Sequence, residues 1–127
     1  MNSFSPVKLG IDRLKSSRQF RQVYDQGRKF SDPYFHLFVL EISEEKIKFG
    51  VTVTRRIGKA VQRNRVKRKF RESFRLLAPY LTKGYSIVMI ARRPSTGVST
   101  PELMEHLKYQ LQQSGIMILN QMTKQQI

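Results

Sequence analysis

Cationic side chains crowd into one short stretch, residues 61–77, whose sequence is VQRNRVKRKFRESFRLL. From Arg55 to Arg75 the chain carries ten basic residues and one acidic residue, Glu72. Like charges at helical neighbour spacing repel each other, and an ordinary solvent-facing helix surface mixes the two signs. Arginine is suited to phosphate because its guanidinium group binds in a bidentate manner and also stacks on bases. The stretch therefore predicts a surface that binds a polyanion.

Side chains that could catalyse hydrolysis are few and scattered. The two histidines, His36 and His106, fall in a predicted strand and a predicted helix, and nothing places them one phosphate apart. The nine acidic residues form no set suited to a two-metal phosphodiesterase site, and no glycine-rich phosphate loop occurs. The chain has no cysteine, which excludes disulfides and thiolate metal sites. We expect no catalytic residue and no metal site in this chain.

The composition predicts one folded domain over residues 1–127. Its apolar fraction of 39% is too high for a disordered chain, and its net charge of +15 points to nucleic acid first and an anionic membrane surface second. No apolar run approaches the roughly 20 residues that a membrane span needs, and residues 1–10 lack the apolar centre of a secretory signal. We therefore expect a cytoplasmic protein that does not act at a membrane.

Periodicity and capping signals predict an α+β fold. Ser16 followed by Gln19 forms a capping-box pattern, and Gly27 can end that helix. The predicted helices cover residues 16–27, 59–78 and 100–115, the predicted strands cover residues 33–42, 46–54 and 84–91, and a further short strand is expected near residues 28–31. Residues 1–15 are expected to run extended over the surface, and no structure is assigned to the tail, residues 116–127.

A helix over residues 59–78 would separate core from charge. At 100° per residue, its predicted core side consists of Val66, Phe70, Phe74 and Leu77. The side roughly opposite consists of Asn64, Arg68, Arg71 and Arg75, with Arg65 and Lys69 beyond them and Lys67 at the boundary. Arg63 falls near the apolar arc, so we expect it to lie past the sheet edge or the helix to begin irregularly.

These residues resemble a known family. The segment RNRVKRKFRE, preceded by VTRRIGKAVQ and followed after a strand by ARRP, is similar to the protein subunit of bacterial ribonuclease P. The upstream segment RLKSSRQFRQVYDQG is similar to the N-terminal helix region of that family, so the resemblance spans residues 13 to about 94. It implies the element order α-β-β-β-α-β-α, a two-layer sandwich with three helices on a mostly antiparallel four-stranded sheet. It also implies a left-handed βαβ crossover, as in the second domain of a small-subunit ribosomal protein.

The resemblance implies an accessory subunit of an endoribonuclease that removes the 5′ leader of precursor tRNA. Its partners would be the ribonuclease P catalytic RNA and precursor tRNA, with no small-molecule substrate. Catalysis would occur in the RNA, with Mg²⁺ held by the RNA and the substrate. The positions implied to bind the partner RNA are Arg55, Arg56, Lys59, Arg63, Asn64, Arg65, Lys67 and Arg68. The positions implied to line the groove for the 5′ leader are Phe20, Tyr24, Phe38, Thr52, Thr54 and Arg71.

Physical chemistry is compatible with this groove but does not demand it. Phe20 and Tyr24 share one helix face, and stacking on such rings contributes about 1–3 kcal/mol per base with little sequence demand. The alternative is that both rings are ordinary core of a short helix. For the whole chain, the main alternative is a ribosomal or other structural RNA-binding protein. A major-groove DNA-binding helix would have to stand clear of the sheet, and a membrane-surface protein would need exposed apolar residues opposite the charge.

Overall fold

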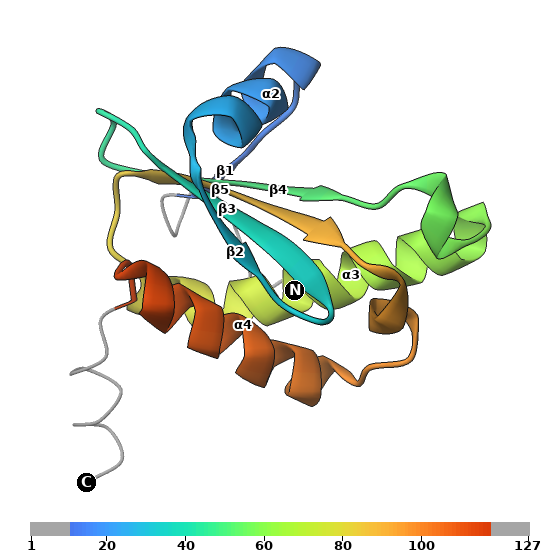
Figure 1. The fold of residues 1–127 in the computed structure, drawn as a ribbon. Coiled ribbons are helices and arrows are strands. Elements are labelled where there is room, and N and C mark those ends of the chain that lie inside the picture. The colour runs from blue at the N-terminus through green and yellow to red at the C-terminus, as the bar shows by residue number, and fades with distance from the viewer. Residues whose placement is uncertain (1–10, 118–127) are drawn as a thin grey trace, which may run out of the picture.

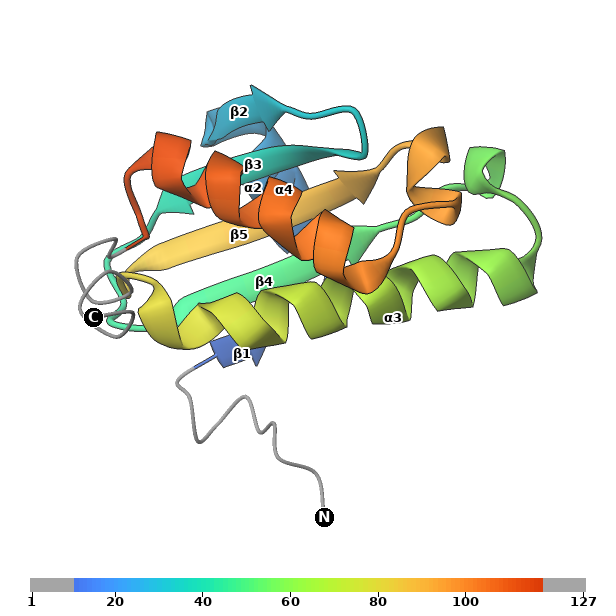
Figure 2. The same cartoon turned by 90° about the horizontal axis from the view of Figure 1, so that it is seen from below.

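The computed structural model describes residues 11–117, which form a sheet with helices on both faces (Figure 1). Helix α2 (Ser17–Gln26) lies on one face. Helices α3 (Ala60–Leu77) and α4 (Thr100–Ser114) lie side by side on the other, as Figure 2 shows. Short 3₁₀ turns are η1 (Arg55–Ile57), η2 (Ala78–Tyr80) and η3 (Arg93–Thr96). The expected two-layer sandwich is therefore wrong in one respect, since helices cover both faces of the sheet.

The sheet is mixed and contains five strands, in the order β1-β4-β5-β3-β2. They are β1 (Ile11–Arg13), β2 (Arg28–Ser31), β3 (Phe35–Glu41), β4 (Ile47–Thr52) and β5 (Tyr85–Ala91). Strand β4 pairs in parallel with β1 and β5, whereas β3 pairs antiparallel with β5 and β2. The expected mostly antiparallel, four-stranded sheet is thus corrected. A helical connection, α3, returns the chain so that β5 runs parallel to β4.

The main core lies between the sheet and helices α3 and α4. The predicted core side of α3 is confirmed, because Val66, Phe70, Phe74 and Leu77 are all buried. Phe74 stacks on Phe49 of β4 with ring centroids 3.8 Å apart, and Phe70 meets Phe35 of β3 edge-on at 6.0 Å. These contacts hold α3 against the sheet, so its remaining sides are left for charged residues.

Both ends of the described segment pack more tightly than expected. Residues Ile11 and Leu14 are buried instead of running over the surface, and the three residues of β1 are too few to give a strand pattern in the sequence. At the other end Ile116 and Met117 are buried, and Met117 forms an isolated bridge with Leu81. The rest of the tail, residues 118–127, lies outside the described residues.

A second, smaller apolar cluster lies under α2. Leu14, Val23 and Val88 are its buried members. Half-buried residues pack around them: Phe20, Tyr24, Phe38, Leu40 and Ile90. Because α2 has only ten residues, it leaves several of these side chains partly open to solvent. This face of the sheet therefore combines packing with accessible aromatic surface.

Candidate nucleic-acid interface

The start of α2 is set by the predicted capping box, which the structure confirms. Ser16 Oγ accepts a hydrogen bond from the Gln19 amide at 3.2 Å, and Gln19 Oε1 accepts one from the Ser16 amide at 3.2 Å. At the other end, the Gly27 amide donates to the Val23 carbonyl at 2.9 Å. A helix with both ends defined presents the same face to the sheet along its length. Phe20 and Tyr24 lie on that face.

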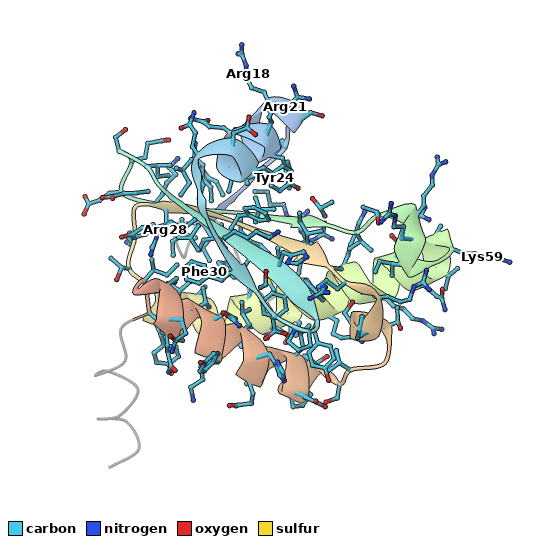
Figure 3. All side chains as sticks on the ribbon, in the orientation of Figure 1. Arg18, Arg21, Tyr24, Arg28, Phe30 and Lys59 are labelled. Carbon is cyan, nitrogen blue, oxygen red and sulfur yellow. The ribbon has the colours of Figure 1, made fainter. Side chains whose placement is uncertain are left out.

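The aromatic side chains expected to line a groove do come together. Tyr24 lies 6.4 Å from Phe20 and meets Phe38 edge-on at 5.2 Å, measured between ring centroids. The Tyr24 hydroxyl also shares a hydrogen bond of 2.6 Å with Thr52 Oγ1 of β4. Figure 3 shows Tyr24 beneath α2 on the side of the sheet, whereas Arg18 points away from it. The rings thus both pack and remain half-exposed, which combines the two alternatives left open by the sequence.

A cavity of about 450 Å³ opens beside these rings. We call it the α2 groove, and it is lined by Lys15, Ser17, Phe20, Arg21, Tyr24 and Thr52. Two cations and two aromatic rings around one opening are the groups that single-stranded RNA needs, for its phosphates and its bases. Lys15 and Arg21 were not singled out in the sequence. Arg21 follows Phe20 directly and precedes Tyr24 by three residues, so helical spacing would have placed it at the groove.

Three expected groove residues do not line the α2 groove: Phe38 contacts the Tyr24 ring but is not part of the lining, and two others lie elsewhere. Thr54 is exposed beyond the end of β4, where it precedes η1, and it does not line the α2 groove. Arg71 belongs to α3, on the opposite face of the sheet from α2, and lines a different cavity. Thr54 lies away from the groove because β4 ends at Thr52, so the strand alternation expected over residues 46–54 does not continue to residue 54.

The cationic residues of η1 and α3 form a second surface, which we call the basic strip. Its members are Arg55, Arg56, Lys59, Arg63, Asn64, Arg65, Lys67 and Arg68. All are exposed except Arg63 and Lys67, which are half-buried. No acidic residue lies in the first turn of α3, and its N-cap, Lys59, makes no side-chain capping bond. Figure 3 shows Lys59 projecting outward from this end of the molecule. Positive charge at a helix N-terminus opposes the helix dipole, so this end favours an anion.

Three basic residues have partners within the protein: Arg63, which belongs to the strip, and Lys69 and Arg75, which follow it in α3. Arg63 donates to the Gly58 carbonyl at 2.8 Å and so folds back on the turn before the helix, which explains its position near the apolar arc. Lys69 donates to the carbonyls of Ser95 and Val98 at 2.8 and 2.6 Å, and burial lowers its pKa. Arg75 pairs with Glu72, with Nε 3.0 Å from Oε1. Lys69 is therefore a structural lysine, not part of the solvent-facing charge.

The histidines and carboxylates are distributed over separate places. His36 Nδ1 lies 3.1 Å from Ser31 Oγ on the sheet face that carries α2. His106 of α4 lies against Asp32, with 3.0 Å between Nδ1 and Oδ1. Within residues 11–117, no three histidine, aspartate or glutamate side chains are placed to hold a metal ion. In the same range, none of the helices combines the length and apolarity needed to cross a lipid bilayer.

Comparisons with known proteins agree on one family. The family described as Ribonuclease P matches residues 11–115. The chain belongs to the ribonuclease P protein family. A ribonuclease P protein component from Clostridium kluyveri is 36% identical over 110 residues, which cover 85% of this chain and 98% of the relative. A second ribonuclease P protein component, from Chloroflexus aurantiacus, is 40% identical over 109 residues, 86% of this chain and 76% of the relative.

Solved structures of ribonuclease P proteins share the fold. The protein from Thermotoga maritima aligns with a TM-score of 0.73 at 29% identity, over 80% of this chain and 96% of that chain. The protein from Staphylococcus aureus aligns with a TM-score of 0.75 at 24% identity, over 83% of this chain and 96% of that chain. The ribonuclease P family therefore accounts for both the sequence and the fold, in preference to a ribosomal protein.

Proposed function

We propose that this chain binds the RNA subunit of ribonuclease P through the basic strip and holds the 5′ leader of precursor tRNA in the α2 groove. The observation that carries the proposal is the contrast between the two surfaces. The strip is rich in exposed arginine and lacks platforms for bases, which suits the phosphates of a folded RNA. The groove joins Phe20 and Tyr24 to Lys15 and Arg21, which suits an unpaired strand.

In this proposal the phosphodiester bond is hydrolysed in the RNA subunit. The protein positions the leader and neutralises charge. The Mg²⁺ that such a reaction needs is assigned to RNA and substrate phosphates, because the side chains around the groove are cationic and would repel the ion. A cytoplasmic location, the left-handed crossover and the likeness to a ribosomal protein domain remain predictions that accompany it.

Reconstitution with a bacterial ribonuclease P RNA at low Mg²⁺ tests the proposal. We expect the protein to restore removal of the 5′ leader from precursor tRNA, and the protein alone to cleave nothing with any divalent ion. Replacing Phe20 and Tyr24 by alanine should weaken binding of leader-bearing tRNA by the holoenzyme and spare mature tRNA, since about 1–3 kcal/mol of stacking per base is removed. Equal loss of affinity for both tRNAs would contradict the assignment of the groove to the leader. Cleavage of precursor tRNA by the purified protein would contradict the proposal that the RNA subunit catalyses the reaction.

A further inference from the structure

The outer edge of the sheet is only partly covered. Strand β1 pairs with β4 over Ile47, Lys48 and Phe49, and the Leu14 amide then donates to the Phe49 carbonyl at 3.0 Å. Strand β4 continues to Thr52, so its last part has no strand partner on this side among the described residues. An uncovered strand edge presents backbone N–H and C=O groups that are free to pair with another group.

A cavity of about 520 Å³ lies along this uncovered edge, between β4 and α3. We call it the β4-edge cleft. Its lining includes Arg13, Phe20, Gly50, Arg68 and Arg71. Its volume lies within the range of about 300–1,000 Å³ that is usual for ligand sites. Apolar side chains form much of its lining, and arginines from β1 and α3 provide its charge.

The charge in the β4-edge cleft is unbalanced. Among residues 11–117, neither Arg13 nor Arg71 forms a hydrogen bond or ion pair with an acidic side chain. Arg13 and Arg71 are both exposed residues, and partial desolvation of the Arg71 guanidinium, followed by the charge of Arg13, lowers the pKa of Arg71. The one carboxylate in the lining, Glu72, is already held by Arg75. Two guanidinium groups that repel each other across a cavity are stabilised when an anion binds between them.

The cleft and the α2 groove are neighbours. Phe20 lines both cavities, so one ring forms a wall of each. Arg68 lines the cleft and is also the last member of the basic strip. RNA that stacks on Phe20 in the α2 groove therefore lies against a side chain that also forms a wall of the β4-edge cleft.

We propose that the β4-edge cleft is a second subsite for the single-stranded leader, in which Arg13 and Arg71 hold a backbone phosphate next to the nucleotide that stacks at Phe20. The proposal rests on the function proposed above and extends it. It adds Arg13, which no sequence pattern singled out. A guanidinium pair is suited to this contact because each group can give two parallel hydrogen bonds to phosphate oxygens.

A scan with neutral linkages tests the subsite. In the reconstituted holoenzyme, each leader phosphate of precursor tRNA is replaced in turn by an uncharged methylphosphonate, and binding is measured. One linkage, or two adjacent ones, should lower affinity by about tenfold, as expected for one lost charge-assisted contact. In the variant Arg13→Gln with Arg71→Gln, affinity for the unmodified leader should fall by a similar factor. In this variant, neutralising the same linkage should no longer lower the affinity.

The control is Arg18→Gln, which removes an exposed arginine that points away from the sheet (Figure 3). It should leave the effect of every linkage unchanged, and circular dichroism should show that all variants are folded. A contrary result would be a double variant that loses affinity by the same factor for every substituted leader and for leaderless tRNA. Arg13 and Arg71 would then bind another part of the RNA, and the subsite would be refuted. If no leader linkage mattered even with the unmodified protein, the leader-binding function itself would fail.

Discussion

At the scale of single residues, Gly50 explains how Phe20 reaches the sheet. A Cβ atom at position 50 would lie 2.5 Å from two atoms of the Phe20 ring and 3.3 Å from Leu14 Cβ. The ring therefore rests on the bare strand backbone, at the wall between the α2 groove and the β4-edge cleft. A glycine inside a strand often marks such a close approach. Any larger side chain must displace the ring.

We predict that Gly50→Ala shifts Phe20 and weakens binding of leader-bearing precursor tRNA severalfold. Its stability should fall by about 1–3 kcal/mol, as for other overpacked sites. Phe20→Ala removes the clashing ring, so the double variant should be less destabilised than the sum of the two single variants. Urea unfolding of the four proteins measures this difference. Additive losses would show that the ring does not rest on Gly50.

His36 lies in a strongly cationic environment. Burial, followed by the charges of Lys29 and Arg92, lowers the pKa of its imidazole from the ordinary value of 6.5. Lys29 also lies over the Phe38 ring, with its Nζ 5.9 Å from the centroid. The imidazole is therefore neutral at pH 7 and resists protonation in the folded protein. In the unfolded chain the imidazole is neither buried nor held beside Lys29 and Arg92, so it binds that proton more readily.

Stability should therefore decrease as the pH falls below 6.5 and continue to decrease until it reaches the lowered pKa of folded His36. We expect His36→Gln to reduce this loss between about pH 7 and pH 5, the range in which histidine titrates. Urea midpoints of both proteins across that range measure the effect. Because His106 is present in both proteins, their difference isolates His36. Parallel pH profiles would contradict the prediction.

At the scale of elements, α3 uses neighbouring cations for different purposes. Lys69 spans from α3 to the segment before α4, where it satisfies the carbonyls of Ser95 and Val98. Arg68, one residue earlier, is exposed and lines the β4-edge cleft. The 100° step between successive helical residues turns one side chain into the protein and the other toward solvent. A run of like charges therefore contains both structural and binding residues.

The same substitution at these two positions should give opposite results. Lys69→Met leaves two carbonyls without their donor and should cost about 1–3 kcal/mol of stability. Arg68→Met should change stability by less than about 0.5 kcal/mol, as surface substitutions usually do, and should weaken RNA binding. Thermal unfolding and titration with ribonuclease P RNA distinguish the two. Loss of RNA affinity with unchanged stability in Lys69→Met would overturn this division.

At the scale of the whole molecule, the net charge of +15 is poorly compensated. Several carboxylates are already held by lysine or arginine at other places, as in the pairs Lys46–Asp12, Lys48–Glu44 and Arg75–Glu72. The basic strip therefore has little counter-charge of its own. Self-repulsion of this kind destabilises a folded protein until salt or a polyanion screens it.

We accordingly predict that the melting temperature of the free protein rises with salt between about 0.1 M and 1 M, over which the Debye length falls from about 10 Å to about 3 Å. Screening also weakens the surface ion pairs, but each contributes only about 0–1 kcal/mol. The rise should be smaller in Arg65→Gln with Arg68→Gln. A melting temperature that is constant or falls with salt would show that repulsion in the strip is not a significant cost.

The sequence by itself determined the features that depend on near neighbours. The capping box at Ser16, the apolar stripe of α3, the short strand at residues 28–31 and the pairing of Phe20 with Tyr24 on one helix face were all predicted and are confirmed. Spacing along one helix or strand is enough to specify each of them, because the residues involved lie within a few positions of one another. The motifs around residues 63–65 likewise predicted the ribonuclease P family.

Only the tertiary structure decided how these parts meet. The pairing of Ile11–Arg13 with β4 and the helices on both faces of the sheet join residues that are distant in sequence. The same is true of Lys69 with Ser95 and Val98, and of the cleft that places Arg13 beside Arg71. Such contacts depend on which surfaces are buried against each other. The spacing of residues within one helix or strand does not specify these contacts, because the segment that packs against it comes from another part of the chain.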